Sequence, residues 1–166
     1  MAEQSFPLIT FYQGWETYQQ SLVETVARLS SEQLTLPTAP HHVSIGTLLS
    51  HMISARVVWF HQLMGEGNPN LVHWNEDGQR VRETIELVVG FEETWHMIVT
   101  ALAHWTQADL GYLFPTPAFM KEDEREDLPP RTRGWIIWHV LEHEIHHGGE
   151  LSLALGGYGL ETHYIH

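Results

Sequence analysis

The chain has 166 residues, of which 43% are hydrophobic and 17% charged, and its formal net charge is −13. This length fits one domain with a sizeable core, and no apolar run approaches the roughly 18 to 20 residues that a membrane span needs. The acidic balance disfavours nucleic acid and anionic lipid as partners. Because the sequence contains no cysteine, disulfides and thiolate ligands are excluded, and any metal must be bound by nitrogen and oxygen.

The N-terminal residues, MAEQSFPLIT, lack the basic and apolar regions of a secretory signal. The eight Lys and Arg residues are scattered and form no basic stripe. We therefore expect a cytoplasmic protein, folded as one domain over residues 1–166, that binds neither nucleic acid nor membrane.

The first two helices are predicted from apolar residues that recur at spacings of three and four. The first spans Phe6–Leu29, and its apolar residues are Leu8, Phe11, Trp15, Tyr18, Leu22, Val26 and Leu29. The second begins near Ser44, a suitable N-cap, and ends before Gly65, Gly67 and Pro69. Its stripe consists of Leu48, Met52, Ala55, Trp59 and Leu63. His51 lies beside that stripe.

The third and fourth helices are separated by a long irregular stretch, Gln107–Arg131. Such a loop is typical of a cover over a site or a long crossover. The third helix is predicted over Asp77–Trp105, with a face made of Val81, Ile85, Val88, Trp95, Val99 and Leu102. The fourth is predicted over Thr132–Leu155, with Ile136, Val140, His143, His147 and Ala154 on one face. Four amphipathic helices bury their apolar faces most simply as a four-helix bundle, so we expect an all-α fold.

The candidate chemistry is concentrated in the fourth helix, where four histidines occur within nine residues. His143 and His147 are four apart, so their imidazoles project from the same side of a helix, as two ligands of one metal ion do. His51, on the inner edge of the second helix, is the best-placed third donor. Three imidazoles leave a position open for water or substrate, which is typical of catalytic metal sites.

The residues from His143 to His147 also match the HExxH pattern of zinc proteases, in which the Glu is the general base. Helical periodicity alone leaves that role open for Glu144. His139 and His146 flank the ligand face, and we favour supporting or surface roles for them. Two acidic residues, Glu92 and Glu150, are suited to accept a ring N–H, but a solvated face or simple salt bridge is the preferred interpretation of each.

Several of these features resemble the DinB/YfiT-like superfamily of metalloenzymes. They are the order of the four segments, the His near the start of the second helix in SIGTLLSH, and the fourth-helix motif HEIHHGGEL. The resemblance covers nearly the whole chain and implies metal ligands at His51, His143 and His147. Family members more often read HHRGQ where this chain has HHGGE, so contacts at that end of the helix are expected to differ.

The resemblance further implies a metal-dependent S-transferase or isomerase that acts on a small-molecule substrate with a low-molecular-weight thiol, and a homodimer. Two alternatives stay open: a hydrolase that uses metal-bound water with Glu144 or Glu142 as base, and a non-catalytic metal-binding stress-response protein. One divalent ion is expected. Zinc or nickel fits three imidazoles, and iron, cobalt and manganese are further candidates.

Overall fold

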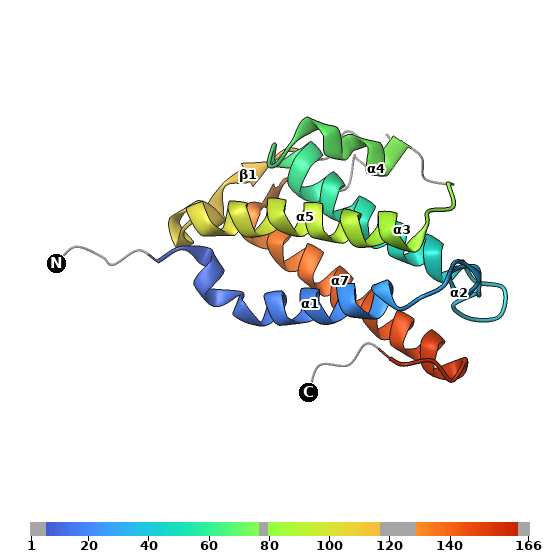
Figure 1. The fold of residues 1–166 in the computed structure, drawn as a ribbon. Coiled ribbons are helices and arrows are strands. Elements are labelled where there is room, and N and C mark those ends of the chain that lie inside the picture. The colour runs from blue at the N-terminus through green and yellow to red at the C-terminus, as the bar shows by residue number, and fades with distance from the viewer. Residues whose placement is uncertain (1–5, 77–79, 117–128, 163–166) are drawn as a thin grey trace.

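The computed structural model describes residues 6–76, 80–116 and 129–162. The predicted all-α fold is confirmed, since long helices form a bundle and the described strands are only two residues long (Figure 1). The long helices are α1 (Gln13–Ala27), α3 (Ile45–Arg56), α5 (Thr84–His104) and α7 (Arg133–Gly157). The shorter elements are η1 (Leu8–Phe11), α2 (Ser31–Leu34), η2 (Val57–Leu63), η3 (Pro69–Val72), α4 (His73–Glu76), η4 (Gln107–Gly111), β1 (Leu113–Phe114) and β2 (Arg131–Thr132).

The helices pack so that α1 contacts α5, while α3 contacts both α5 and α7. Figure 1 shows α1 and α7 running beneath α3 and α5, with the small strand pair at one end of the bundle. Apolar side chains from all four helices meet in one core between them. None of the described helices is long and apolar enough to cross a membrane.

The first predicted helix is divided in the structure. The chain forms the 3-10 helix η1, leaves helical geometry at Tyr12, and begins α1 at Gln13. Because a 3-10 turn has about three residues rather than 3.6, η1 does not continue the register of α1. Phe11 is exposed as a result, so its predicted place in the core is wrong, whereas the other six residues of that predicted stripe are buried.

The second predicted helix is confirmed at both ends. The Oγ atom of Ser44 accepts a hydrogen bond from the backbone N–H of Thr47 at 3.2 Å, which caps α3. The helix continues as the π-helix η2 and stops before Gly65, whose φ of 78° favours glycine. Its buried residues include Leu48, Leu49, Met52, Ile53 and, unexpectedly for a charged residue, Arg56.

The predicted start of the third helix is wrong, and its predicted face is wrong in part. The helix α5 begins at Thr84 rather than near Asp77, which lies outside the described residues, and its start is stabilised by Glu86, whose carboxylate accepts a bond from the backbone N–H of Glu83. Val81 and Ile85 are 79% and 68% exposed. Leu102 of the predicted face is buried, and Val88 and Trp95 pack against the core. The buried residues of the helix are Leu87, Gly90, Phe91, Thr94, Met97, Ile98, Ala101 and Leu102. Apolar spacing did not reveal this face because it includes a glycine and a threonine.

The fourth predicted helix is confirmed as α7. Thr132 caps its start, since its Oγ1 atom accepts a hydrogen bond from the backbone N–H of Trp135 at 3.1 Å. Within the stretch predicted to be irregular, η4 forms and β1 pairs antiparallel with β2. Residues 117–128 of that stretch lie outside the described part of the chain, so the expected cover or crossover is described only in part.

Candidate metal centre

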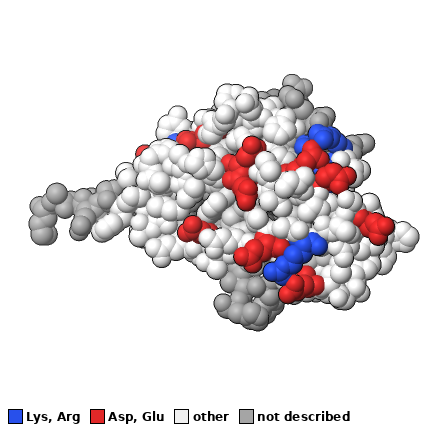
Figure 2. All heavy atoms as spheres, in the orientation of Figure 1, with Lys and Arg blue, Asp and Glu red and all other residues white. Residues whose placement is uncertain are grey.

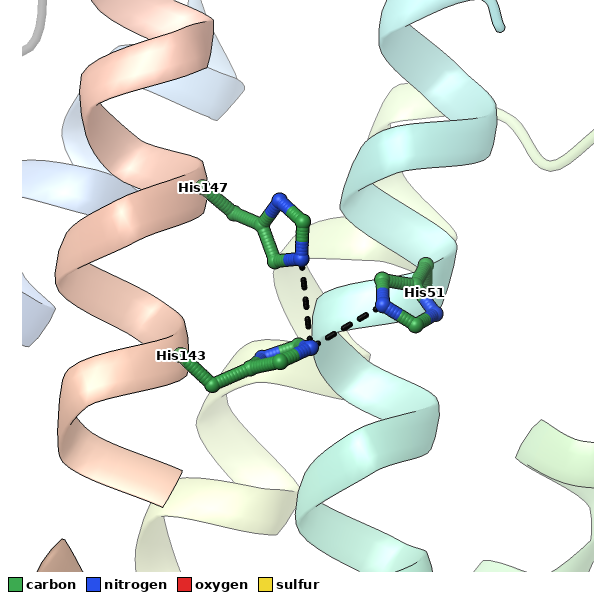
Figure 3. A group of neighbouring side chains, drawn as sticks. All are labelled: His51, His143 and His147. Carbon is green, nitrogen blue, oxygen red and sulfur yellow. Dashed lines mark hydrogen bonds between the residues drawn. The ribbon is translucent and has the colours of Figure 1, made fainter. Parts of the chain in front are cut away.

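Three histidines from two neighbouring helices point toward one another (Figure 3). His51 projects from α3, and His143 and His147 project from successive turns of α7. The Nε2 atom of His143 lies 3.0 Å from Nε2 of His51 and 3.2 Å from Nε2 of His147. The structure therefore brings together the three residues that the sequence selected as candidate ligands.

These distances fit a metal ion better than they fit hydrogen bonds. With metal–nitrogen bonds of about 2.0 to 2.1 Å, tetrahedral ligands lie about 3.3 Å apart, close to the separations observed. An imidazole Nε2 atom has only one position in the ring plane for a proton or a lone pair, so His143 cannot form two good hydrogen bonds there. One cation that faces three lone pairs would satisfy all three rings. The cluster could therefore hold a metal ion.

The electrostatics of the cluster keep His143 in the neutral form that binds metals. Burial, followed by the nearby His147 and His51, lowers the pKa of His143 from its usual 6.5 to about 3. Burial also lowers the pKa of His51. A ligand histidine must be unprotonated, so these rings need not lose a proton at neutral pH before they bind an ion.

Glu150 supports this arrangement, although sequence reasoning excluded it from the site. Its Oε2 atom lies 2.6 Å from Nδ1 of His147, one turn earlier on α7. The ring then donates its Nδ1–H to the carboxylate and keeps its Nε2 lone pair directed at the cluster. This bond lowers the pKa of Glu150, so the carboxylate stays charged. The i, i+3 spacing of His147 and Glu150 was the signal available in the sequence.

His143, the other histidine of the pair on α7, has fewer hydrogen-bond partners than His147. The Nδ1 atom of His143 is buried and has no hydrogen-bond partner among the described residues. Only its Nε2 atom faces the cluster, so the single interaction available to this ring in the site is at that nitrogen. Metal-bound histidines usually donate this second ring N–H to an acceptor, so His143 lacks the support that Glu150 gives His147.

Glu144 follows His143 directly but lies about 100° around α7 from it, on the part of the helix that faces the bundle core. Its side chain is 0% exposed and forms a salt bridge with Arg56, which is also 0% exposed, with Nε 2.5 Å from Oε1. Its second oxygen accepts a hydrogen bond from the indole of Trp15 at 2.8 Å. The HExxH pattern left open a role for this carboxylate beside the metal ligands, and the structure instead places it in a buried ion pair.

The ion pair belongs to a network that connects all four long helices. Arg56 of α3 also donates to the side chain of Gln19 on α1 at 2.6 Å. It further donates to the backbone oxygen of Phe91 at 3.0 Å and to the hydroxyl of Thr94 at 3.2 Å, both on α5. Sequence reasoning missed this network because Arg56 adjoins the apolar stripe of its helix but is not part of it.

The remaining candidates lie around the cluster rather than within it. His139 stacks on Trp135, with ring centroids 4.8 Å apart and an interplanar angle of 14°. His146 is exposed, and its Nε2 atom lies 3.4 Å from Oε1 of Glu150. His146, His147 and Glu150 form a second candidate group, but the bond between His147 and Glu150 already uses that nitrogen of His147. Glu92 is exposed on α5 and does not line the cleft at the histidines.

A cleft of about 410 Å³ opens beside the histidine cluster. Its described lining residues are Thr38, His42, Val43, Thr47, Leu48, Ser50, His51, Ser54, Trp74, Arg82, His147 and Glu150. His51 and His147 therefore border both the cluster and the cleft, so a small molecule in the cleft would lie next to the candidate metal position. A cavity of a few hundred Å³ is the usual size for a small-molecule site.

Comparisons with known proteins agree with this fold. A family model described as "DinB family" matches residues 1–165. The crystal structure of a DinB-like protein from Bacillus cereus matches with a TM-score of 0.73 and 21% sequence identity, covering 98% of this chain and 99% of that chain. This structural likeness shows the shared fold. Among curated proteins, none matches the sequence.

Proposed function

Because the chain belongs to the DinB family, we propose that it is a metal-dependent enzyme that acts on a small electrophile together with a low-molecular-weight thiol. His51, His143 and His147 would hold one divalent ion. The observation that carries this proposal is the convergence of three Nε2 atoms, at 3.0 and 3.2 Å from the central one, beside an open cleft. The resemblance to thiol-dependent transferases and isomerases supplies the reaction class.

A divalent ion in this site would lower the pKa of a bound thiol, so that its sulfur becomes nucleophilic at neutral pH. The chain's own residues prepare the position for that chemistry. His143 stays neutral because it is buried, and Glu150 holds the ring of His147 in the required tautomer. Since the sequence has no cysteine, the reacting sulfur arrives with a substrate. Zinc and nickel are the ions we propose first, with iron, cobalt and manganese as alternatives.

The hydrolase alternative is less well supported, because it needs a general base near the metal. Both carboxylate oxygens of Glu144 are engaged in the core by Arg56 and Trp15. Glu142 is exposed, with a carboxylate oxygen 3.8 Å from His139 rather than at the cluster. Glu150 is committed to His147. None of these three carboxylates on α7 is therefore placed to act as a general base at the metal position.

A purely structural metal is also less well supported. Structural zinc sites are closed by four protein ligands, whereas catalytic sites have three and an open position. Among the described residues, the cluster offers three ring nitrogens, and two of these rings border the cleft. The arrangement therefore favours an ion that small molecules can reach.

The test is turnover of an electrophile panel with and without a small thiol, using zinc-loaded and metal-free protein. We expect product only when both thiol and metal are present, and none with a His143→Gln variant. Glu142→Gln is the matched control on the same helix and should retain activity. Turnover that needs metal but no thiol would support the hydrolase, and metal loading without turnover of any electrophile would support the non-catalytic alternative.

We also propose that the protein is a cytoplasmic homodimer. On α7, Trp138 and Ile145 are 60% and 54% exposed, and Leu141 lies between them on the same helix face. Apolar side chains three and four residues apart form a continuous stripe that a second copy would cover. Sedimentation at micromolar concentration should show a dimer for the wild type and a shift toward monomer for Ile145→Glu. A monomer-sized species alone would contradict the proposal.

A further inference from the structure

The two carboxylate oxygens of Glu150 face different histidines. Its Oε2 atom lies 2.6 Å from Nδ1 of His147, and this contact orients the ring of that candidate ligand. Its Oε1 atom lies 3.4 Å from Nε2 of His146. Because the two contacts use different oxygens and different rings, the support of His147 leaves Oε1 of Glu150 and Nε2 of His146 for a separate role.

The separation of these two atoms fits two ligands of one ion. It is longer than the roughly 2.7 to 3.2 Å that is usual for an N–H···O hydrogen bond. It is close to the distance of about 3.3 Å between tetrahedral ligands whose bonds to the metal are about 2.0 to 2.1 Å long. His146 and Glu150 are four residues apart on α7, a spacing that places both side chains on the same side of the helix.

The position between the two atoms is open to solvent. The side chains of His146 and Glu150 are 61% and 44% exposed. Gly149 adjoins them, and a Cβ atom added there would have nothing within 4 Å. An ion at this position would therefore have space for the water molecules that complete its coordination. Glu150 also lines the cleft together with His147, so the position lies next to the proposed metal centre.

The charge of the protein favours a cation at this position. The formal net charge is −13, and Figure 2 shows acidic side chains spread over one face of the molecule, with basic groups in few places. Among the described residues, the ion-pair partners of Glu150 are two histidines, and neither a lysine nor an arginine pairs with it. A divalent ion would therefore be attracted to the protein and would displace no basic side chain from this carboxylate.

From this geometry we propose a second, weaker divalent-ion site on α7, formed by Oε1 of Glu150, Nε2 of His146 and water. Glu150 is then shared, since one of its oxygens orients His147 for the first ion and the other binds the second. Because it has only two protein ligands, the second site binds less tightly than the three-histidine centre. Protein purified without added metal therefore retains one ion. The second site goes beyond the proposed reaction and does not depend on a thiol.

The shared carboxylate couples the two ions. An ion on Oε1 withdraws charge from the carboxylate, which becomes a poorer acceptor for the Nδ1–H of His147. The ring of His147 is then a weaker ligand for the first ion, and the two cations also repel each other. Each ion should therefore lower the affinity for the other by the same factor, so that excess metal acts against the first centre.

The test is equilibrium dialysis of the untagged protein against zinc from submicromolar to submillimolar concentrations, with bound zinc measured by elemental analysis. We expect one tight and one weaker ion in the wild type. His146→Gln removes a ligand of the second site and should weaken only that ion, by about tenfold or more. His104→Gln is the matched control, because His104 is 54% exposed and lies 3.9 Å from Glu66 in an ordinary surface pair. It should leave both ions unchanged.

Two further variants test the sharing of Glu150. Glu150→Gln should weaken both ions, because the two sites use the same carboxylate. His143→Gln should abolish tight binding of the first ion and leave the second site intact. The second ion should then bind more tightly than in the wild type, because the charge of the first ion is gone.

A wild type that binds a single ion throughout the titration would overturn the second site. A second ion that binds equally well to the wild type and to His146→Gln would also overturn it, since that ion would lie elsewhere. An unchanged second affinity in Glu150→Gln would contradict the shared carboxylate. Absence of the tight ion would overturn the three-histidine centre alone, because the second site is judged by His146→Gln.

Discussion

Two adjacent faces of α7, an inner side toward the bundle core and an outer side toward His51, carry residues with different physical roles. On the inner side, Glu144 is fully buried, and both of its oxygens are bound by side chains from other helices. On the outer side, His143 and His147 face His51 with ring nitrogens that cannot all be satisfied by hydrogen bonds. The polar groups of the inner side are therefore fully hydrogen-bonded within the protein, whereas the ring nitrogens of the outer side are left with a position for a ligand.

This difference separates what stabilises the fold from what binds a ligand. The network at Arg56 joins α1, α3, α5 and α7, so it fixes the position of α7 against α3. The histidine cluster depends on that position, because its ligands come from these same two helices. Changes on the inner side should therefore lower stability, and changes on the outer side should lower metal affinity.

The largest expected effect is that of Glu144→Ala on stability. The substitution leaves the charge of Arg56 buried without its partner, which costs about 3–5 kcal/mol in the free energy of unfolding. Urea unfolding of the metal-free protein at neutral pH measures it. Glu142→Ala, on the exposed side of the same helix, is the control and should change stability by no more than about 0.5 kcal/mol.

A double variant sharpens this prediction. Arg56→Met with Glu144→Leu removes both charges, so it should be less destabilising than Glu144→Ala alone. A loss below about 1 kcal/mol for Glu144→Ala would show that the buried ion pair does not hold the helices together.

The next effect is stabilisation by metal, which should depend on the outer side alone. Zinc at about 100 times its dissociation constant should raise the free energy of unfolding of the wild type by about 2.7 kcal/mol. His143→Gln should show none of this gain, yet its metal-free form should be about as stable as the metal-free wild type. An equal gain in both proteins would place the ion elsewhere.

A smaller effect is expected at the carboxylate that orients His147. Glu150→Gln should weaken zinc binding by about 10- to 100-fold, because residues that support metal ligands contribute on this scale. Competition with a chromophoric chelator gives the affinity. An unchanged zinc affinity would show that Glu150 forms only a surface ion pair with His146 and His147.

The smallest effect concerns the pH dependence of the metal-free protein. The pKa of His143 is about 3 in the folded state and about 6.5 when the chain is unfolded, so the unfolded chain binds the additional proton between these values. Stability should therefore fall as the pH decreases below about 6.5. Thermal melts at pH 7.5 and 5 should show a smaller decrease for His143→Gln than for the wild type, and equal decreases would contradict the assignment.

Sequence reasoning predicted best those parts whose signals are local. The N-cap Ser44, the start of the fourth helix at Thr132 and the histidine spacing on α7 depend on neighbouring residues, and the structure places them as expected. The face of α5 was predicted wrongly in part, because Gly90 and Thr94 are buried by close packing rather than by apolar character. A Cβ atom at Gly90 would lie 2.5 Å from the Trp74 ring.

The pairing of buried polar groups could not be predicted from the sequence, for a different reason. Arg56 and Glu144 are 88 residues apart, and each resembles a surface charge in its own segment. Arg82 likewise belongs to a segment before α5 that was predicted to be helical, and only the fold brings it into the cleft with His51. Long-range pairing of charges cannot be deduced from helical periodicity.

Metal content is the most direct test of the central claim. Untagged protein, purified without chelator, is analysed by elemental analysis beside His51→Ala, His143→Gln and His147→Ala variants. The account predicts about one divalent ion per wild-type chain, and much less in each folded variant. A folded wild type that neither carries nor takes up zinc, nickel or manganese, or variants that retain the ion in full, would contradict it.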